Sequence, residues 1–189
     1  MLTARLKTLL RRFRDETHGS FVVEAVIALP LLFWSLAATY EFFEIHRYKS
    51  VREKATYTVA DLLSREQSVV TETYMDNVKQ LFDAVSHDNG VNQIRVSVIR
   101  YLANDDIYTV EWSKVRGTGG LAVLTDTDAA QMRTRLPVLS DGEEVILVET
   151  RSVYDPTFDV GLTAGLDIPT RMFTHLRFAP QLCFEKCTS

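Results

Sequence analysis

The sequence predicts an α+β protein in which an apolar amino-terminal helix leads into a small domain of helices packed on an antiparallel sheet. Three observations predict this class. An apolar run lies near the amino terminus, a one-sided apolar stripe with helical spacing follows it, and later segments alternate apolar and polar residues. The length of 189 residues and the apolar fraction of 46% fit one compact domain with an appendage.

The first element is an apolar segment over residues 20–40. As a helix it covers roughly 30 Å at about 1.5 Å per residue, which is the thickness of a bilayer core. Residues 1–19 carry five basic and two acidic side chains, whereas residues 41–189 carry 16 basic and 22 acidic ones. By the positive-inside rule, residues 1–19 are a basic cytoplasmic leader and the acidic part lies outside the cytoplasm. The sequence therefore predicts a single transmembrane helix.

Two other interpretations of this segment stay open. A basic region before an apolar run also describes a secretory signal peptide, which would release a soluble protein, but its apolar core is usually about 7–15 residues. Residues 20–40 form a longer run that holds an early Glu. A buried helix of a soluble protein fits less well, because large apolar side chains would point in all directions around it. A membrane span is the favoured interpretation.

The helical period persists after the span but becomes one-sided. Apolar residues recur at intervals of three and four at Ile45, Tyr48, Val51, Ala55, Val59 and Leu62. Residues 41–66 are therefore expected to form a helical stalk that continues the membrane helix and packs its stripe on the domain. Pro30 removes one backbone hydrogen bond inside the span, which predicts a helix kink there.

The domain of residues 67–189 is expected to begin with a helix over residues 70–85. This helix should end near His87, where the following Gly90 suits a left-handed cap. Alternation then predicts strands over residues 93–101 and 107–115, joined by an Asn-Asp-Asp turn into an antiparallel hairpin.

One short helix and two further strands complete the predicted domain. Asp128 and Gln131 are typical of a helix cap, so a helix should run to about Leu136. Residues 144–154 are strongly β-prone and residues 171–178 are predicted as the last strand, with a long loop between them. The result is a sheet of about four antiparallel strands.

The motifs of known active sites are missing from the sequence. The four histidines form no metal-binding pair on one helix face, and no Ser lies in a Gly-x-Ser-x-Gly elbow. Residues 117–120, Gly-Thr-Gly-Gly, lack the ending of a phosphate loop and are interpreted as a turn. Asp126 and Asp128 could suggest a metal pair, but a helix cap explains them without a ligand. We expect no catalytic residue, no metal and no cofactor; an enzyme whose residues are dispersed in the sequence is the alternative.

The two cysteines, Cys183 and Cys187, indicate a compartment. Outside the cytoplasm they can form a disulfide, which oxidising compartments maintain. The bridge needs a turn, because an extended strand would hold the two Cα atoms roughly 13 Å apart, beyond the about 4.4–6.8 Å that a disulfide tolerates. A disulfide that closes so small a loop contributes about 2 kcal/mol at most to the stability of the fold, so its role would be to pin the tail. Two unpaired thiols are the alternative, and a metal site would need two further ligands.

Glu24 is a carboxylate inside the apolar run, five residues after Gly19. Its side chain can reach towards the headgroups, and its charge suits a helix amino terminus. A second explanation begins with a cut after Gly19, which would create an α-amino group on Ser20. That amine in one copy could pair with the Glu24 carboxylate of a neighbouring copy, which would make burial of the charge tolerable and favour the correct axial stagger.

Residues 19–32, Gly-Ser-Phe-Val-Val-Glu-Ala-Val-Ile-Ala-Leu-Pro-Leu-Leu, resemble a known family. A basic leader ending in Gly19, a Glu at the fifth position after the cut and a membrane helix that continues as a stalk are similar to type IV prepilins and pseudopilins. Pro30 followed by two leucines resembles the TadE/TadF-like proteins of the tight-adherence (Tad, Flp) pilus systems. The resemblance covers residues 17–50, about a fifth of the chain. Ala25 departs from it, because the family commonly has an aromatic residue there.

The resemblance implies that prepilin peptidase cleaves between Gly19 and Ser20 and that Glu24 serves assembly. It implies a minor pseudopilin or pilus biogenesis component of the inner (cytoplasmic) membrane, with the amino terminus in the cytoplasm and the carboxyl-terminal domain in the periplasm. The expected partners are membrane lipid, other pilins and pseudopilins, Tad assembly proteins and prepilin peptidase, with no nucleic acid. The alternative is a membrane-anchored extracytoplasmic enzyme or binding domain, for which a pocket with converging polar groups would speak.

Overall fold

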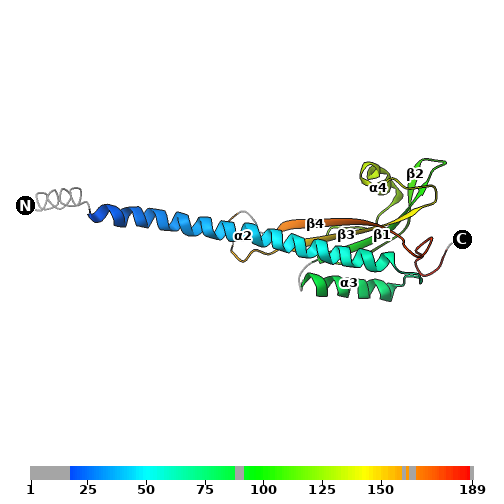
Figure 1. The fold of residues 1–189 in the computed structure, drawn as a ribbon, viewed down its shortest axis with the longest axis horizontal. Coiled ribbons are helices and arrows are strands. Elements are labelled where there is room, and N and C mark those ends of the chain that lie inside the picture. Colours follow the sequence, from blue (N-terminus) through cyan, green and yellow to red (C-terminus); the bar gives the residue numbers. More distant parts are fainter. Residues whose placement is uncertain (1–17, 88–91, 159–160, 162–164, 188–189) are drawn as a thin grey trace, which may run out of the picture. The chain divides into compact units, whose positions relative to one another are not determined.

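The structure is a computed structural model that describes residues 18–87, 92–158, 161 and 165–187. Its elements in chain order are helices α2 (His18–Ser64) and α3 (Glu72–Ser86), strands β1 (Asn92–Leu102) and β2 (Ile107–Gly117), helix α4 (Asp126–Gln131), a 3-10 turn η1 (Arg133–Arg135), and strands β3 (Glu144–Tyr154) and β4 (Leu166–His175) (Figure 1). The predicted α+β class is confirmed, as are the long amino-terminal apolar helix and the antiparallel sheet of four strands.

The described residues fall into two compact units, and α2 contributes to both. The first unit holds residues 18–44 of α2 together with the described part of the segment 156–163. The second holds residues 45–155 and the chain from 165 onward. The helix is continuous over 47 residues, so the predicted continuation of the apolar helix into a second helical stretch is present. Residues 45–64 of that stretch belong to the same unit as the sheet.

The sheet has the strand order β2-β1-β3-β4, and every neighbouring pair is antiparallel. In the second unit, α3 and residues 45–64 of α2 cover one face (Figure 1). The core between these helices and the sheet contains Ala55, Val59, Leu63, Met75, Val78, Phe82, Ile94, Val96, Val98, Ile146 and Val148. Thr56 of α2 adds a buried polar contact, because its hydroxyl lies 2.8 Å from that of Thr170 on β4.

A smaller core covers the opposite face. It contains Ile99, Leu124, Leu136, Leu139, Val145 and Leu147. Successive side chains of a strand point to opposite faces, so Val145 and Leu147 meet this core while Ile146 and Val148 meet the helices. Because both faces are covered, the central strand β3 carries the uninterrupted apolar run 145–148.

The predicted cap of the short helix is wrong by three residues. The N-cap of α4 is Thr125, whose hydroxyl accepts the backbone N–H of Asp128 at 3.3 Å, and the Asp128 carboxylate accepts the N–H of Thr125 at 3.0 Å. Asp128 is thus the third residue of a capping box and not its first. The hydrogen bonds from Thr125 lower the pKa of the Asp128 carboxyl. The helix ends at Gln131, short of the predicted Leu136, and continues as η1.

The last strand begins earlier than predicted. β4 occupies Leu166–His175 instead of residues 171–178, and Pro169 lies opposite Arg151 of β3. β4 is an edge strand, where a proline removes no hydrogen bond that the sheet needs. Pro169, within the stretch predicted to be a long loop, therefore lies inside a strand.

The first helix of the domain and the hairpin match the prediction to within two residues at each end. Thr71 caps α3, accepting the N–H of Tyr74 at 3.2 Å. The left-handed residue that ends α3 is His87, with φ of 54°. The predicted cap residue Gly90 lies outside the described residues.

Candidate functional site

The amino-terminal part of α2 presents apolar side chains around its whole circumference. Phe21, Val26 and Leu31 are 76%, 65% and 65% exposed. The most apolar window has a mean hydropathy of 2.1, and none of it is buried within the protein. Among the described residues this is the one helix long and apolar enough to cross a membrane. A helix that is apolar on all sides needs an apolar environment on all sides.

Four of the residues predicted to be functional lie on this helix. Gly19 and Ser20 are in the first turn of α2, which begins at His18. Glu24 follows in the second turn with its side chain exposed. Ser20 and Glu24 are four residues apart in this helix. Pro30 lies within the helix, which runs through it without interruption.

A second carboxylate marks the other end of the apolar stretch. Glu41 is fully buried, and one of its oxygens accepts the backbone N–H of Phe158 at 2.6 Å. The rings of Phe158 and Tyr40 meet edge to face, with centroids 5.6 Å apart. All three residues belong to the first unit. The sequence pattern did not indicate Glu41, although its position directly after the apolar run was a visible signal.

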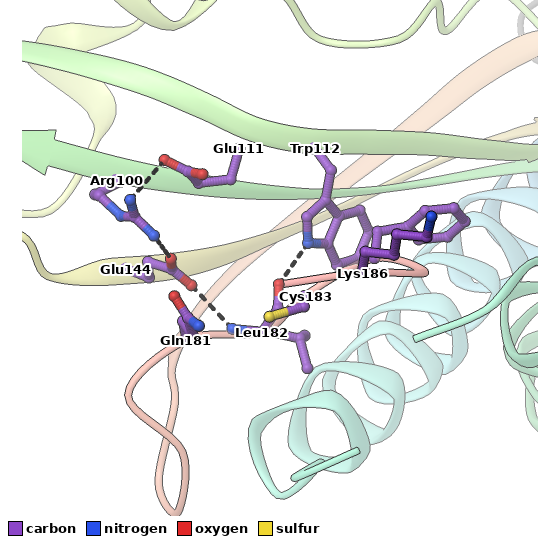
Figure 2. Close-up of a pocket in the computed structure, with 9 residues that line it drawn as sticks. Arg100, Glu111, Trp112, Glu144, Gln181, Leu182, Cys183 and Lys186 are labelled. Carbon is purple, nitrogen blue, oxygen red and sulfur yellow. Dashed lines mark hydrogen bonds and ion pairs between the residues drawn. The ribbon is translucent and has the colours of Figure 1, made fainter. Parts of the chain in front are cut away.

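In the second unit, a pocket of about 200 Å³ lies on the helix-covered side of the sheet, where the carboxyl-terminal tail crosses it (Figure 2). Three of its four charged lining side chains form a chain. Arg100 of β1 lies between two carboxylates, 3.2 Å from Glu111 of β2 and 2.5 Å from Glu144 of β3. The second oxygen of Glu144 accepts the backbone N–H of Leu182 at 3.0 Å. Trp112 donates its indole N–H to the Leu182 carbonyl at 2.6 Å.

These contacts attach the carboxyl-terminal tail to the sheet, and they fit a structural role better than a catalytic one. A general acid or base must be placed to exchange a proton with a substrate. Glu144 instead holds a guanidinium with one oxygen and a main-chain amide with the other. Glu144 and Trp112, which line the pocket, thus fix the tail to the sheet at Leu182.

The tail beyond Leu182 is closed by a disulfide between Cys183 and Cys187, whose Cα atoms lie 4.9 Å apart. Glu185 supplies the turn that the bridge requires, with φ of 55°. Val70 exchanges two backbone hydrogen bonds with this turn, donating to the Cys183 carbonyl at 2.9 Å and accepting from the Glu185 N–H at 2.8 Å. The tail is thus attached to the start of the domain independently of the bridge.

Replacing both cysteines by serine is therefore expected to have a limited effect. The loop is short and the contacts at Leu182 and Val70 persist, so the free energy of unfolding should fall by about 2 kcal/mol at most. Denaturant unfolding of the full chain in detergent, followed by circular dichroism, measures this change. Failure of the Cys183→Ser, Cys187→Ser variant to fold would contradict the assignment of the bridge as a local pin.

A buried charged cluster lies on the opposite face of the sheet. Glu149 of β3 receives hydrogen bonds from its two cross-strand neighbours, from Arg95 Nε at 2.8 Å and from Arg171 Nη2 at 2.7 Å. Arg95 also donates to the Ala122 carbonyl at 2.7 Å. The side chains of Glu149 and Arg95 are 6% and 11% exposed. The sequence reasoning missed this cluster; the charges within the β-prone run 144–154 were its only signal.

A second pocket, of about 370 Å³, lies beside this cluster. Its lining includes Glu149, Arg171 and a further pair, Arg151 and Asp167, which are 2.6 Å apart. The charged side chains at this pocket therefore also find partners within the protein.

Ion pairs between α3 and β2 fix the first helix of the domain. Lys114 lies 2.7 Å from Glu72, and Arg116 bonds both Glu72 and Asp76. The hydrogen bond from Lys114 lowers the pKa of the Glu72 carboxyl. Burial, together with a nearby carboxylate, raises the pKa of the Tyr74 hydroxyl well above its ordinary value. The ion pairs of Glu72 and Asp76 hold the helix in place on the sheet.

No three His, Cys, Asp or Glu side chains converge to hold a metal ion in the part of the chain that the structure describes. Comparisons with family models, with curated proteins and with solved structures find no match for this chain. The residues and their geometry therefore carry the functional assignment.

Proposed function

We propose that this protein is a minor pseudopilin or pilus biogenesis component of a Tad (Flp type IV) pilus or secretion system. The observation that carries the proposal is the position of Glu24, five residues after Gly19, at the start of a helix that is apolar on all sides. A carboxylate at this depth is expensive in a bilayer, which favours a functional reason for its place.

In this proposal residues 20–40 cross the inner membrane and the second unit lies in the periplasm. The positive charge of residues 1–19 supports this orientation. The disulfide between Cys183 and Cys187 also supports it, because oxidising compartments maintain such bridges.

Assembly follows from the chemistry of a cut after Gly19. Cleavage leaves a charged amine on Ser20 at the end of the mature helix. In the low dielectric of the membrane, that amine and the Glu24 carboxylate of an adjacent subunit attract strongly, and each lowers the cost of burying the other. The pair forms at one axial stagger only, so it selects the register in which subunits join. Prepilin peptidase, other pilins and the Tad assembly proteins are the partners of this scheme.

The alternative is a membrane-anchored extracytoplasmic enzyme or binding domain. Its best support would be one of the two pockets beside the charged side chains described above. The carboxylates that line them, Glu111, Glu144, Glu149 and Asp167, all hold arginines. This pairing favours a domain that presents a surface to partners over one that acts on a substrate.

Glu24→Ala is expected to separate assembly from membrane insertion. The amount of protein in the membrane should be unchanged, while surface pili should fall by about tenfold, the loss that corresponds to about 1.4 kcal/mol of pairing. Quantitative blots of membrane and sheared pilus fractions measure both. Glu24→Asp should retain part of the assembly and Glu24→Gln little.

Glu44→Ala is the matched control, because Glu44 is a carboxylate of the same helix beyond the apolar stretch. It should leave pilus production at the wild-type level. An equal loss of insertion and assembly in Glu24→Ala would contradict the assembly role and indicate a charge that only positions the helix end.

A further inference from the structure

Aromatic side chains gather where the apolar stretch of the first unit ends. Tyr40, Phe42 and Phe43 of α2 are 45%, 58% and 66% exposed, and Phe158 of the segment 156–163 is 50% exposed. The Phe158 ring contacts that of Tyr40, and the rings of Phe42 and Phe43 lie 6.0 Å apart. We call these four residues the aromatic collar.

Glu41 fastens the part of the collar that comes from outside the helix. Phe158 is 117 positions away in the sequence, in the connection between β3 and β4. Its backbone N–H donates to the buried Glu41 carboxylate at 2.6 Å. A buried amide without an acceptor is costly in apolar surroundings, and this bond provides one. This hydrogen bond thus places Phe158 beside the helix at the level of Glu41.

The distribution of the rings indicates what they contact. At about 100° per residue, Phe42 and Phe43 lie about 200° and 300° around the helix from Tyr40. The three rings of α2 thus lie within about 160° of one another. Phe158 contacts Tyr40 and is bonded to Glu41, about 100° from Tyr40 on the other side, so with Phe158 the collar extends over more than half of the circumference. A protein partner or a second copy would cover one side, whereas the boundary of a bilayer surrounds a helix on every side.

Across the collar the sequence changes from uncharged to charged residues, as is expected where a helix leaves a bilayer. Residues 25–39 before it carry no charge, and Glu44, Arg47 and Lys49 follow within three turns. Aromatic rings are enriched at this boundary, where an apolar body meets the headgroups.

We infer that the aromatic collar lies in the headgroup region of the membrane, so that Phe158, which follows β3, is a lipid contact that sets the depth of the helix. This inference rests on the proposed insertion of residues 20–40. The occupant of the exposed aromatic surface is lipid, and a protein neighbour is the outcome that would overturn it.

The test is photocrosslinking of the full chain in native membrane vesicles, with p-benzoylphenylalanine in place of one residue at a time. Position 158 probes the collar, and position 31 probes the middle of the apolar stretch. Position 178 is the control, because Phe178 is also an exposed phenylalanine, at 63%, but belongs to the second unit. Lipid adducts are expected at 31 and 158 and absent at 178.

The outcomes separate this inference from the proposed function. Lipid adducts at 31 without any at 158 overturn the collar and leave the membrane span intact. Absence of adducts at both positions overturns the insertion itself. Adducts of position 158 to protein instead of lipid assign the collar to a subunit or partner contact and overturn the inference.

Glu41 provides a second readout on the same probe. In the Glu41→Ala variant the lipid adduct at 158 should be lost while that at 31 persists, because the acceptor that holds Phe158 is removed. Glu41→Gln keeps an acceptor oxygen and should retain the adduct. Equal adducts at 158 in wild type and Glu41→Ala would overturn the role of Glu41 in positioning the ring.

Discussion

Glu149→Ala is expected to lower the free energy of unfolding by about 3–5 kcal/mol, the range found when one partner of a buried ion pair is removed. The carboxylate joins Arg95 and Arg171 across three strands of the sheet. Arg95 is the more buried of the two arginines and would keep its charge without a counter-ion. The penalty therefore comes mainly from the arginine left behind.

Denaturant unfolding of the full chain in detergent, followed by circular dichroism, measures this loss. Asp167→Ala is the matched control on the same face, because its pair with Arg151 is about 40% exposed and should be worth about 1 kcal/mol or less. The double variant Arg95→Met, Glu149→Leu should recover most of the stability, since apolar replacement of a whole buried pair is often neutral. Equal losses for Glu149→Ala and Asp167→Ala would contradict the importance of burial.

Gly19→Leu is expected to abolish processing. The proposed cut follows Gly19, and the absence of a side chain there lets the backbone approach an enzyme closely. In cells with active prepilin peptidase the variant should retain residues 1–19, whereas the wild-type protein should lose them. A carboxyl-terminal tag and an immunoblot report the difference in mobility.

Ser20→Ala is the control for this experiment, because it changes the other side of the same bond without adding bulk. It should be processed like wild type. If Gly19→Leu and the wild-type protein migrate equally, whether as the full-length or as the cleaved species, this would contradict a cut that depends on Gly19.

The elements that depend on local pattern could be predicted from the sequence. The apolar stripe with helical spacing indicated the continuous helix α2, and the alternation in β1 and β2 indicated the hairpin. The start of β4 could not be predicted in the same way. Residues 166–170 form a strand because they pair with β3, and Pro169 is tolerated there only because β4 is at the edge.

The polar contacts that fix the sites depend on partners far away in the sequence. Glu149 and Arg95 are 54 positions apart, and Glu41 and Phe158 are 117 apart. No periodicity indicates such pairs, because each residue is an ordinary charge or aromatic group in its own segment. Glu24 and Gly19, in contrast, could be identified from the sequence, because the pattern that they form is a fixed spacing of nearby residues.

The amino terminus of the native chain tests the pseudopilin proposal most directly. Mass spectrometry of protein extracted from the membranes of cells with active prepilin peptidase is predicted to find a mature chain that begins at Ser20. A chain that begins at Met1 or Leu2 in those cells would contradict the proposal.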